Sequence, residues 1–182
     1  DSALGGKLHL EYAVYPLRPK KPAGTANGLL SFFTAPFFHG NIAHLISNTL
    51  LFIISARLVL LAGERIFFVV TPVLMVVCGA GVKIFGQRPA IGMSGVIIGY
   101  VSYVLSIDLF TRNSALVVLG AISLILTAML LDGSRIDKGL GMVSVILPTN
   151  PEVFKVGHFF GFVGGLMAAC VMSLVYAYEF NL

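Results

Sequence analysis

Two residues in this sequence could form a catalytic pair, Ser94 and His158, and each opens a long apolar segment. A serine hydroxyl is a weak nucleophile until a base within hydrogen-bond reach removes its proton, and an imidazole has a suitable pKa for that role near neutrality. The pair could therefore carry out acyl transfer. Because the carboxylate nearest to His158, that of Glu152, falls in a predicted loop, a Ser-His dyad is favoured over a triad.

Acyl transfer also needs donors for the developing oxyanion, and His44 and Asn48 could supply them. Their i, i+4 spacing places both side chains on one face of a helix. The backbone N–H of Ser94, at a predicted helix start, is a further donor. The predicted site thus combines a nucleophile, a base and several oxyanion donors, and it needs no metal or cofactor.

The composition predicts an all-α polytopic membrane protein. The chain has 182 residues, of which 57% are hydrophobic and 11% charged, and its mean hydropathy is +0.94. These values are far too apolar for a soluble domain of this length. Cys78 and Cys170 lie inside apolar runs, where a thiol packs as a small hydrophobe more often than it forms a disulfide.

Hydropathy predicts five membrane spans, at about residues 42–61, 66–82, 94–109, 114–131 and 157–178. We expect residues 1–41 to form a membrane-surface segment and first loop, because prolines interrupt it and its apolar stretch 29–38 is too short to span. Residues 42–182 are then the transmembrane catalytic domain. The long connection 132–156 is typical of a lid or binding loop.

Consecutive spans alternate in direction, so the first, third and fifth must start on the same membrane face. His44 and Asn48, then Ser94, then His158 occupy those starts. Polar side chains are costly in lipid, and four of them at one depth indicate a site built between helices.

Simpler interpretations exist for each of these residues. A single histidine at a membrane helix end is more often an interfacial or packing residue than a catalyst. The glycines could merely allow close helix contact, since Gly95 and Gly99 form a small-xxx-small pair, as do Gly161 and Gly165. Both interpretations can hold together, because close packing would bring Ser94 and His158 within reach. His39 is expected to be a structural hydrogen-bonding residue.

Four short motifs together resemble the rhomboid family of intramembrane serine proteases, and the resemblance covers about residues 30–178. The motifs are Phe38-His39-Gly40, His44-Leu45-Ile46-Ser47-Asn48, Ile91-Gly92-Met93-Ser94-Gly95 and Gly157-His158-Phe159-Phe160-Gly161. The resemblance implies that Ser94 is the nucleophile and His158 the general base. It also implies that Asn48 and His44 bind the oxyanion, that Gly92, Gly95, Gly161 and His39 support the site, and that the substrate is another protein's transmembrane segment.

The sequence departs from the family pattern in three places. The family core has six helices, so a helix preceding Asp1 is expected to be missing from this chain. Some relatives carry a tyrosine that stacks on the catalytic histidine, where this chain has Ile98, which leaves Tyr100 or packing alone to orient His158. The Trp-Arg pair of some first loops is absent, since the chain contains no Trp.

The charge distribution conflicts with the orientation that the resemblance implies. Nine Lys and Arg residues fall on the site side of the predicted topology and three, Arg57, Arg65 and Arg112, on the other. The positive-inside rule would place the site in the cytoplasm, whereas the resemblance implies a bacterial inner membrane with the site on the extracytoplasmic face. We follow the resemblance, because the rule depends on the first helix and flanking tail.

The expected partners are transmembrane protein substrates and the lipid bilayer, with no nucleic acid. Two alternative functions remain open from the sequence. A catalytically silent rhomboid-like protein would bind membrane clients without cutting them. Alternatively, His44 and His158 could ligate haem or line a transport path. Neither alternative explains a serine flanked by glycines at the start of the intervening helix.

Overall fold

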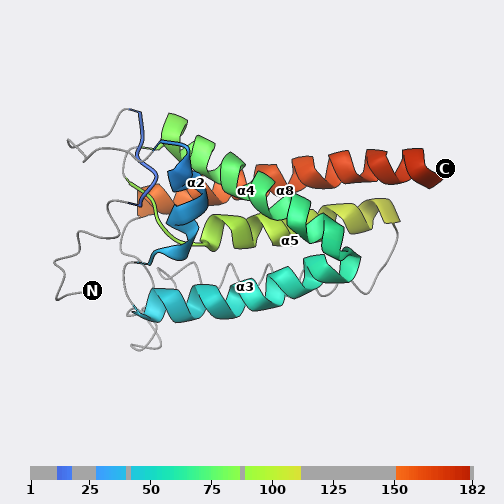
Figure 1. Cartoon of the computed structure of the whole chain (residues 1–182), viewed down its shortest axis with the longest axis horizontal. Coiled ribbons are helices and arrows are strands. Elements are labelled where there is room, and N and C mark those ends of the chain that lie inside the picture. The colour runs from blue at the N-terminus through green and yellow to red at the C-terminus, as the bar shows by residue number, and fades with distance from the viewer. Residues whose placement is uncertain (1–11, 18–27, 40–41, 87–88, 112–150, 181–182) are drawn as a thin grey trace.

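The structure is a computed structural model that describes residues 12–17, 28–39, 42–86, 89–111 and 151–180. The described residues form helices, apart from loops and one isolated β-bridge. In chain order, the elements are α2 (Leu30–Thr34), the 3-10 helix η2 (Ala35–Phe37), α3 (Ile42–Ala62), α4 (Glu64–Phe85), α5 (Ser94–Thr111) and α8 (Pro151–Phe180) (Figure 1).

Three of the described helices are long and apolar enough to cross a membrane. The qualifying stretches are His44–Ala62 in α3, Glu64–Phe85 in α4 and Val156–Val175 in α8, and α5 contributes the shorter apolar stretch Ser94–Ile107. The prediction of an all-helical integral membrane protein is confirmed. The short α2 and η2 agree with the expectation that residues 29–38 do not span.

The predicted helix starts agree with the structure for some helices and not for others. Helices α3 and α5 begin at or next to the predicted residues. The prediction that residues 151–156 belong to a loop is wrong, because α8 already begins at Pro151, a residue that suits the first turn of a helix. The predicted span 114–131 and residues 132–150 lie outside the described part of the chain.

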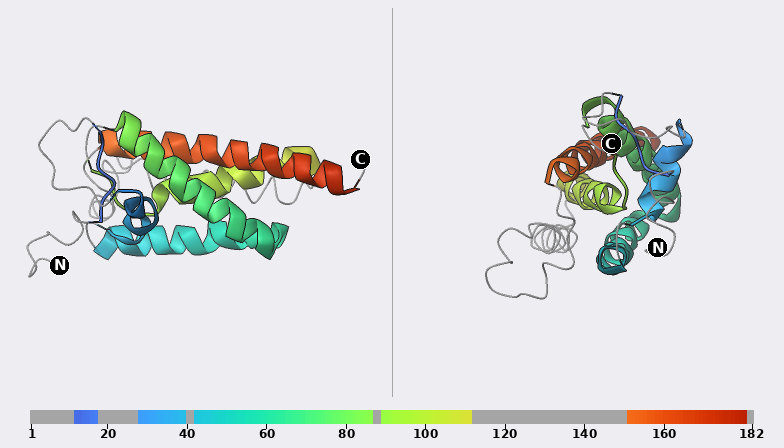
Figure 2. Two further views of the ribbon diagram at one scale, coloured as in Figure 1. Left: turned by 45° about the horizontal axis from the view of Figure 1, so that its top comes forward. Right: turned by 90° about the vertical axis from the view of Figure 1, so that its left-hand side faces the viewer.

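Helices α3, α5 and α8 start at the same end of the molecule, as the alternation of spans predicts (Figures 1 and 2). Helix α4 runs in the opposite direction and crosses them obliquely. In both side views, α5 begins further inside the bundle than α3 and α8 do. The loop that precedes α5 must therefore descend between the other helices before Ser94 is reached.

The main core surrounds α5, whose Tyr100, Val101 and Tyr103 have no exposed surface. The Tyr100 hydroxyl is hydrogen-bonded to Thr71 on α4 at 2.6 Å, and its ring packs against Phe52 and Phe67. Tyr100 therefore faces α3 and α4. The possibility that it orients His158 is not supported by these contacts.

Helices α5 and α8 are in backbone contact through glycines, which confirms the predicted small-xxx-small packing. A Cβ atom added to Gly161 would overlap the Gly95 carbonyl oxygen, and one added to Gly165 would overlap the Gly99 carbonyl oxygen. One added to Gly95 would lie 3.0 Å from the Gly157 carbonyl oxygen. The two helices that carry Ser94 and His158 are thus held as close as their backbones allow.

A smaller hydrophobic cluster joins residues 12–17 and α2 to the end of α4. Its buried members are Val14, Phe32, Ala35 and Val82. The ring of Phe32 lies over Gly79, where an added Cβ would come within 2.5 Å of it. This cluster packs α2 against the end of α4.

Candidate active site

Ser94 is the first residue of α5, where backbone N–H groups lack an acceptor within the helix. The turn before it depends on Gly92, whose φ of 106° suits glycine and strains other residues. The Gly92 N–H donates to the Ala35 carbonyl at 2.9 Å. Thus η2 anchors the loop that presents Ser94.

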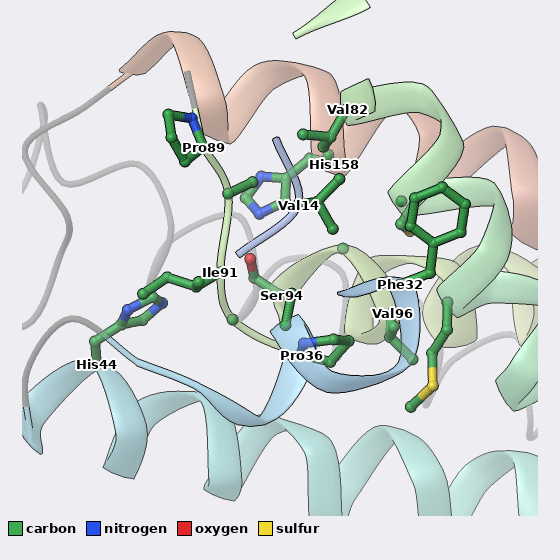
Figure 3. Close-up of a pocket in the computed structure, with 18 residues that line it drawn as sticks. Val14, Phe32, Pro36, His44, Val82, Pro89, Ile91, Ser94, Val96 and His158 are labelled. Atoms are coloured by element: carbon green, nitrogen blue, oxygen red, sulfur yellow. The ribbon is translucent and has the colours of Figure 1, made fainter. Parts of the chain in front are cut away.

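His158 enters the same region from α8. It lies about 10 Å along the helix axis from Pro151, given a rise of about 1.5 Å per residue. The start of α5 is likewise set back from that end of the molecule (Figure 2). The contact between Gly95 and Gly157 sets the neighbouring turns of α5 and α8 face to face. Figure 3 shows the Ser94 hydroxyl pointing toward the His158 imidazole.

Ser94, His44 and His158 line one cavity of about 250 Å³. Gly92 and Gly95 also line it, next to the nucleophile. The remaining walls are mainly apolar and come chiefly from residues 12–17, α2, η2, α4 and the loop 89–91 (Figure 3). The cavity therefore offers a hydroxyl and two imidazoles between largely apolar walls.

His44 and Asn48 lie on one face of α3, as their spacing predicts, and both are buried. The His44 ring packs on the Gly92 turn: a Cβ added to Gly92 would lie 3.1 Å from Cε1 and 3.3 Å from Nε2 of that ring. Asn48 lies one helical turn further along α3 and does not line the cavity. Its Nδ2 donates to the His44 carbonyl at 2.9 Å, and its Oδ1 has no hydrogen-bond partner among the described residues.

His39 lies beside His44 rather than in the cavity. Their rings meet edge to face with centroids 5.0 Å apart. Burial lowers the pKa of His39 below its ordinary value, so its imidazole is neutral at neutral pH. Neither ring nitrogen of His39 makes a hydrogen bond of ordinary geometry among the described residues, so the predicted hydrogen-bonding role is not supported. The neutral ring can instead hold the His44 imidazole in place through packing.

The sequence did not predict most of the apolar residues that line the cavity. Val14, Phe32 and Cys78 line it, and only the apolar character of their segments indicated burial.

Cys78 and Cys170 are both free thiols, as predicted. Within the described ranges, no three side chains of the metal-ligating types come together.

Comparison with known proteins gives one family. The model of the rhomboid domain matches residues 26–175. Uncharacterized proteins of Mycobacterium tuberculosis and Mycobacterium bovis are 29% identical over 95% of this chain and 68% of their own length. An uncharacterized protein of Mycobacterium leprae is 29% identical over 76% of this chain and 54% of its own length. No solved structure matches significantly. Because the family model covers most of its length, this chain belongs to the rhomboid family.

Proposed function

We propose that the chain is an intramembrane serine endopeptidase that hydrolyses a peptide bond in or near a transmembrane segment of another protein. The observation that carries this proposal is the cavity shared by Ser94 of α5, His158 of α8 and His44 of α3. Three polar side chains from three helices meet at one depth inside a membrane domain. Polar side chains are costly to place inside a membrane, so such an arrangement indicates a functional site.

In the proposed mechanism, His158 takes the proton of the Ser94 hydroxyl as the oxygen attacks the substrate carbonyl. The oxyanion accepts hydrogen bonds from the Ser94 backbone N–H and the His44 imidazole, which line the cavity. We propose the second N–H of the Asn48 amide, one helical turn away, as a further donor. His158 then protonates the leaving amine. Water hydrolyses the acyl-enzyme with His158 again as the base.

The proposed substrate is a helix that must unwind near the site. A membrane helix keeps its carbonyls in internal hydrogen bonds, so a scissile bond inside it is inaccessible to Ser94. A cleavable segment should therefore contain residues that weaken a helix, such as Gly or Pro. Polar residues at the cavity allow water to reach the acyl-enzyme.

Cleavage of a model transmembrane substrate in detergent tests the proposal. Ser94→Ala and His158→Ala should each abolish cleavage, because one removes the nucleophile and the other the base. Ser106→Ala is a matched control on α5, since Ser106 is hydrogen-bonded within its own helix to the Ser102 carbonyl at 2.7 Å. Undiminished cleavage by the Ser94 variant would refute the proposal. A wild-type protein that binds but never cuts would indicate a silent family member.

We also propose a bacterial inner-membrane location with the cavity on the extracytoplasmic side. The mycobacterial relatives support a bacterial membrane, and the family supports the side. In a background without Cys78 and Cys170, single cysteines at Lys20 and Arg112 test the side. An impermeant thiol reagent applied to whole cells should label the first and not the second.

A further inference from the structure

One wall of the cavity comes from residues 12–17, which lie outside the region matched by the rhomboid model. Val14 is the member of this segment that reaches the cavity. It is 4% exposed, and Figure 3 shows it next to His158 and within the same close-up as Ser94. The family match thus says nothing about a residue that borders the candidate dyad.

The backbone of Val14 is fixed by pairing with the loop that leads to Ser94. The Val14 N–H donates to the Ala90 carbonyl, and the Ala90 N–H donates to the Val14 carbonyl, both at 3.0 Å. The Leu17 N–H donates to the Lys83 carbonyl at 2.7 Å. Tyr12 stacks on Phe38 with ring centroids 4.5 Å apart. The wall cannot move outward without breaking these contacts.

The side chain of Val14 is also packed from behind. It belongs to the hydrophobic cluster with Phe32, Ala35 and Val82. Among the described residues, no Asp, Glu, Lys or Arg lines the cavity. The wall that Val14 forms is therefore apolar and held in place, so the space in front of it suits an uncharged side chain of limited volume.

The proposed chemistry identifies which substrate side chain must occupy this space. When the Ser94 Oγ forms an ester, the residue that supplied the carbonyl stays bonded to the enzyme until water releases it. Its side chain must then fit in the cavity around Ser94. We infer that Val14 is a specificity-determining residue that limits the size of the apolar side chain on the amino side of the scissile bond. This inference rests on the proposed function.

A series of transmembrane substrates that differ only at that residue tests the inference. The residue is Ala in one substrate and Leu in another, and mass spectrometry of the products locates the cut. Val14→Ala removes two methyl groups from the wall and should raise the ratio of kcat/KM for Leu over Ala by about tenfold, since one methylene in an apolar pocket already discriminates substantially. Val14→Ile should lower the same ratio by about threefold.

A matched control separates the wall from general loosening of the core. Val70→Ala removes the same atoms from a residue of α4 that is 1% exposed and does not line the cavity. It should leave the ratio unchanged, even where it lowers both rates. Loss of fold in a Val14 variant would likewise lower both rates together. If Val14 limits the side-chain size, the Leu/Ala ratio should instead rise in Val14→Ala and fall in Val14→Ile.

The outcomes distinguish this inference from the function on which it rests. If wild type cleaves both substrates and the ratio stays constant in both Val14 variants, the inference fails and the protease remains. If Val14→Ala accelerates every substrate by the same factor, residues 12–17 obstruct the cavity rather than select side chains, and the inference again fails. If wild type cleaves neither substrate and Ser94 reacts with no fluorophosphonate, the proposed function fails and the inference with it.

Discussion

The two sides of the candidate active site are held by different kinds of contact. Ser94 and His158 lie on α5 and α8, which touch through backbone atoms at Gly95, Gly99 and Gly161. His44 and Asn48 lie on α3, which meets α5 through side chains. For example, the ring centroids of Phe52 and Tyr100 are 5.9 Å apart. Where backbones touch, no side chain can rotate to accommodate an added atom. Where side chains touch, they can rotate or shift to do so.

This difference separates two roles. The distance between a nucleophile and its base must be kept to a fraction of an ångström, because a misplacement of about 1 Å can cost about a hundredfold in rate. If Ser94 and His158 are that pair, as proposed, the glycine contact would supply the precision. In the proposed mechanism, the donors on α3 stabilise the charge on the substrate oxygen and do not position Ser94 or His158, so we expect them to be removable without disturbing the pair. The following substitutions test this separation.

Gly161→Ala should have the largest combined effect. The added Cβ would overlap the Gly95 carbonyl oxygen and force α5 and α8 apart. We expect a loss of about 1–3 kcal/mol in stability from overpacking and a fall of more than about a hundredfold in cleavage rate. Thermal unfolding in detergent and cleavage of a model substrate measure the two.

Gly164→Ala is the matched control on α8, since its added Cβ would meet the side chains of Leu74 and Val77 at 3.1 Å rather than backbone. Those side chains can shift, so both losses should be smaller than in Gly161→Ala. Equal losses in the two variants would show that backbone contact has no special importance.

Asn48→Ala should lower the cleavage rate by about a hundredfold, as expected for loss of one oxyanion donor, while stability changes little. The Asn48 amide is hydrogen-bonded within its own helix to the His44 carbonyl, so its removal breaks no hydrogen bond between the described helices. Steady-state kinetics should show the loss in kcat rather than KM.

Ser55→Ala provides the control on the same helix, because Ser55 is buried and bonded to the Leu51 carbonyl at 2.8 Å but lies two turns beyond Asn48. It should cleave at nearly the wild-type rate. If Asn48→Ala unfolds at a much lower temperature than Ser55→Ala, Asn48 is structural and the separation of roles is wrong.

Ser102→Ala should have the smallest effect. Ser102 donates to the Phe162 carbonyl at 2.8 Å, which is a hydrogen bond between α5 and α8. Its loss should cost about 1 kcal/mol of stability and change cleavage by less than about threefold, since the glycine contact remains. A large loss of cleavage with little loss of stability would mean that this bond, rather than the glycines, fixes the pair.

The sequence predicted the parts of the fold that depend on apolar length and glycine spacing. The starts of α3 and α5, their common membrane face with α8, and the contact between Gly95 and Gly161 followed from those patterns. The start of α8 at Pro151 could not be predicted in this way, because hydropathy identifies the apolar part of a helix and not its polar first turns. The division of the chain at residue 41 remains a prediction.

The cavity was only partly predictable. Ser94, His44 and His158 could be grouped because polar residues stand out in apolar segments. Val14 could not be grouped with them, because its pairing with Ala90 joins two segments that are far apart in sequence. Local sequence patterns do not show which distant segments pair. Tyr100 was named as one possible residue to orient His158, but its hydroxyl is instead hydrogen-bonded to Thr71 on α4.

The central claim is that Ser94 and His158 act as a nucleophile and its base, and reaction with a fluorophosphonate probe tests it most directly. The purified protein should become labelled at Ser94, as identified by mass spectrometry. Labelling should disappear in Ser94→Ala and fall to background in His158→Ala, while the folded Ser106→Ala control keeps it. Labelling that survives in the His158 variant at the wild-type rate, or that never occurs at Ser94, would contradict the account.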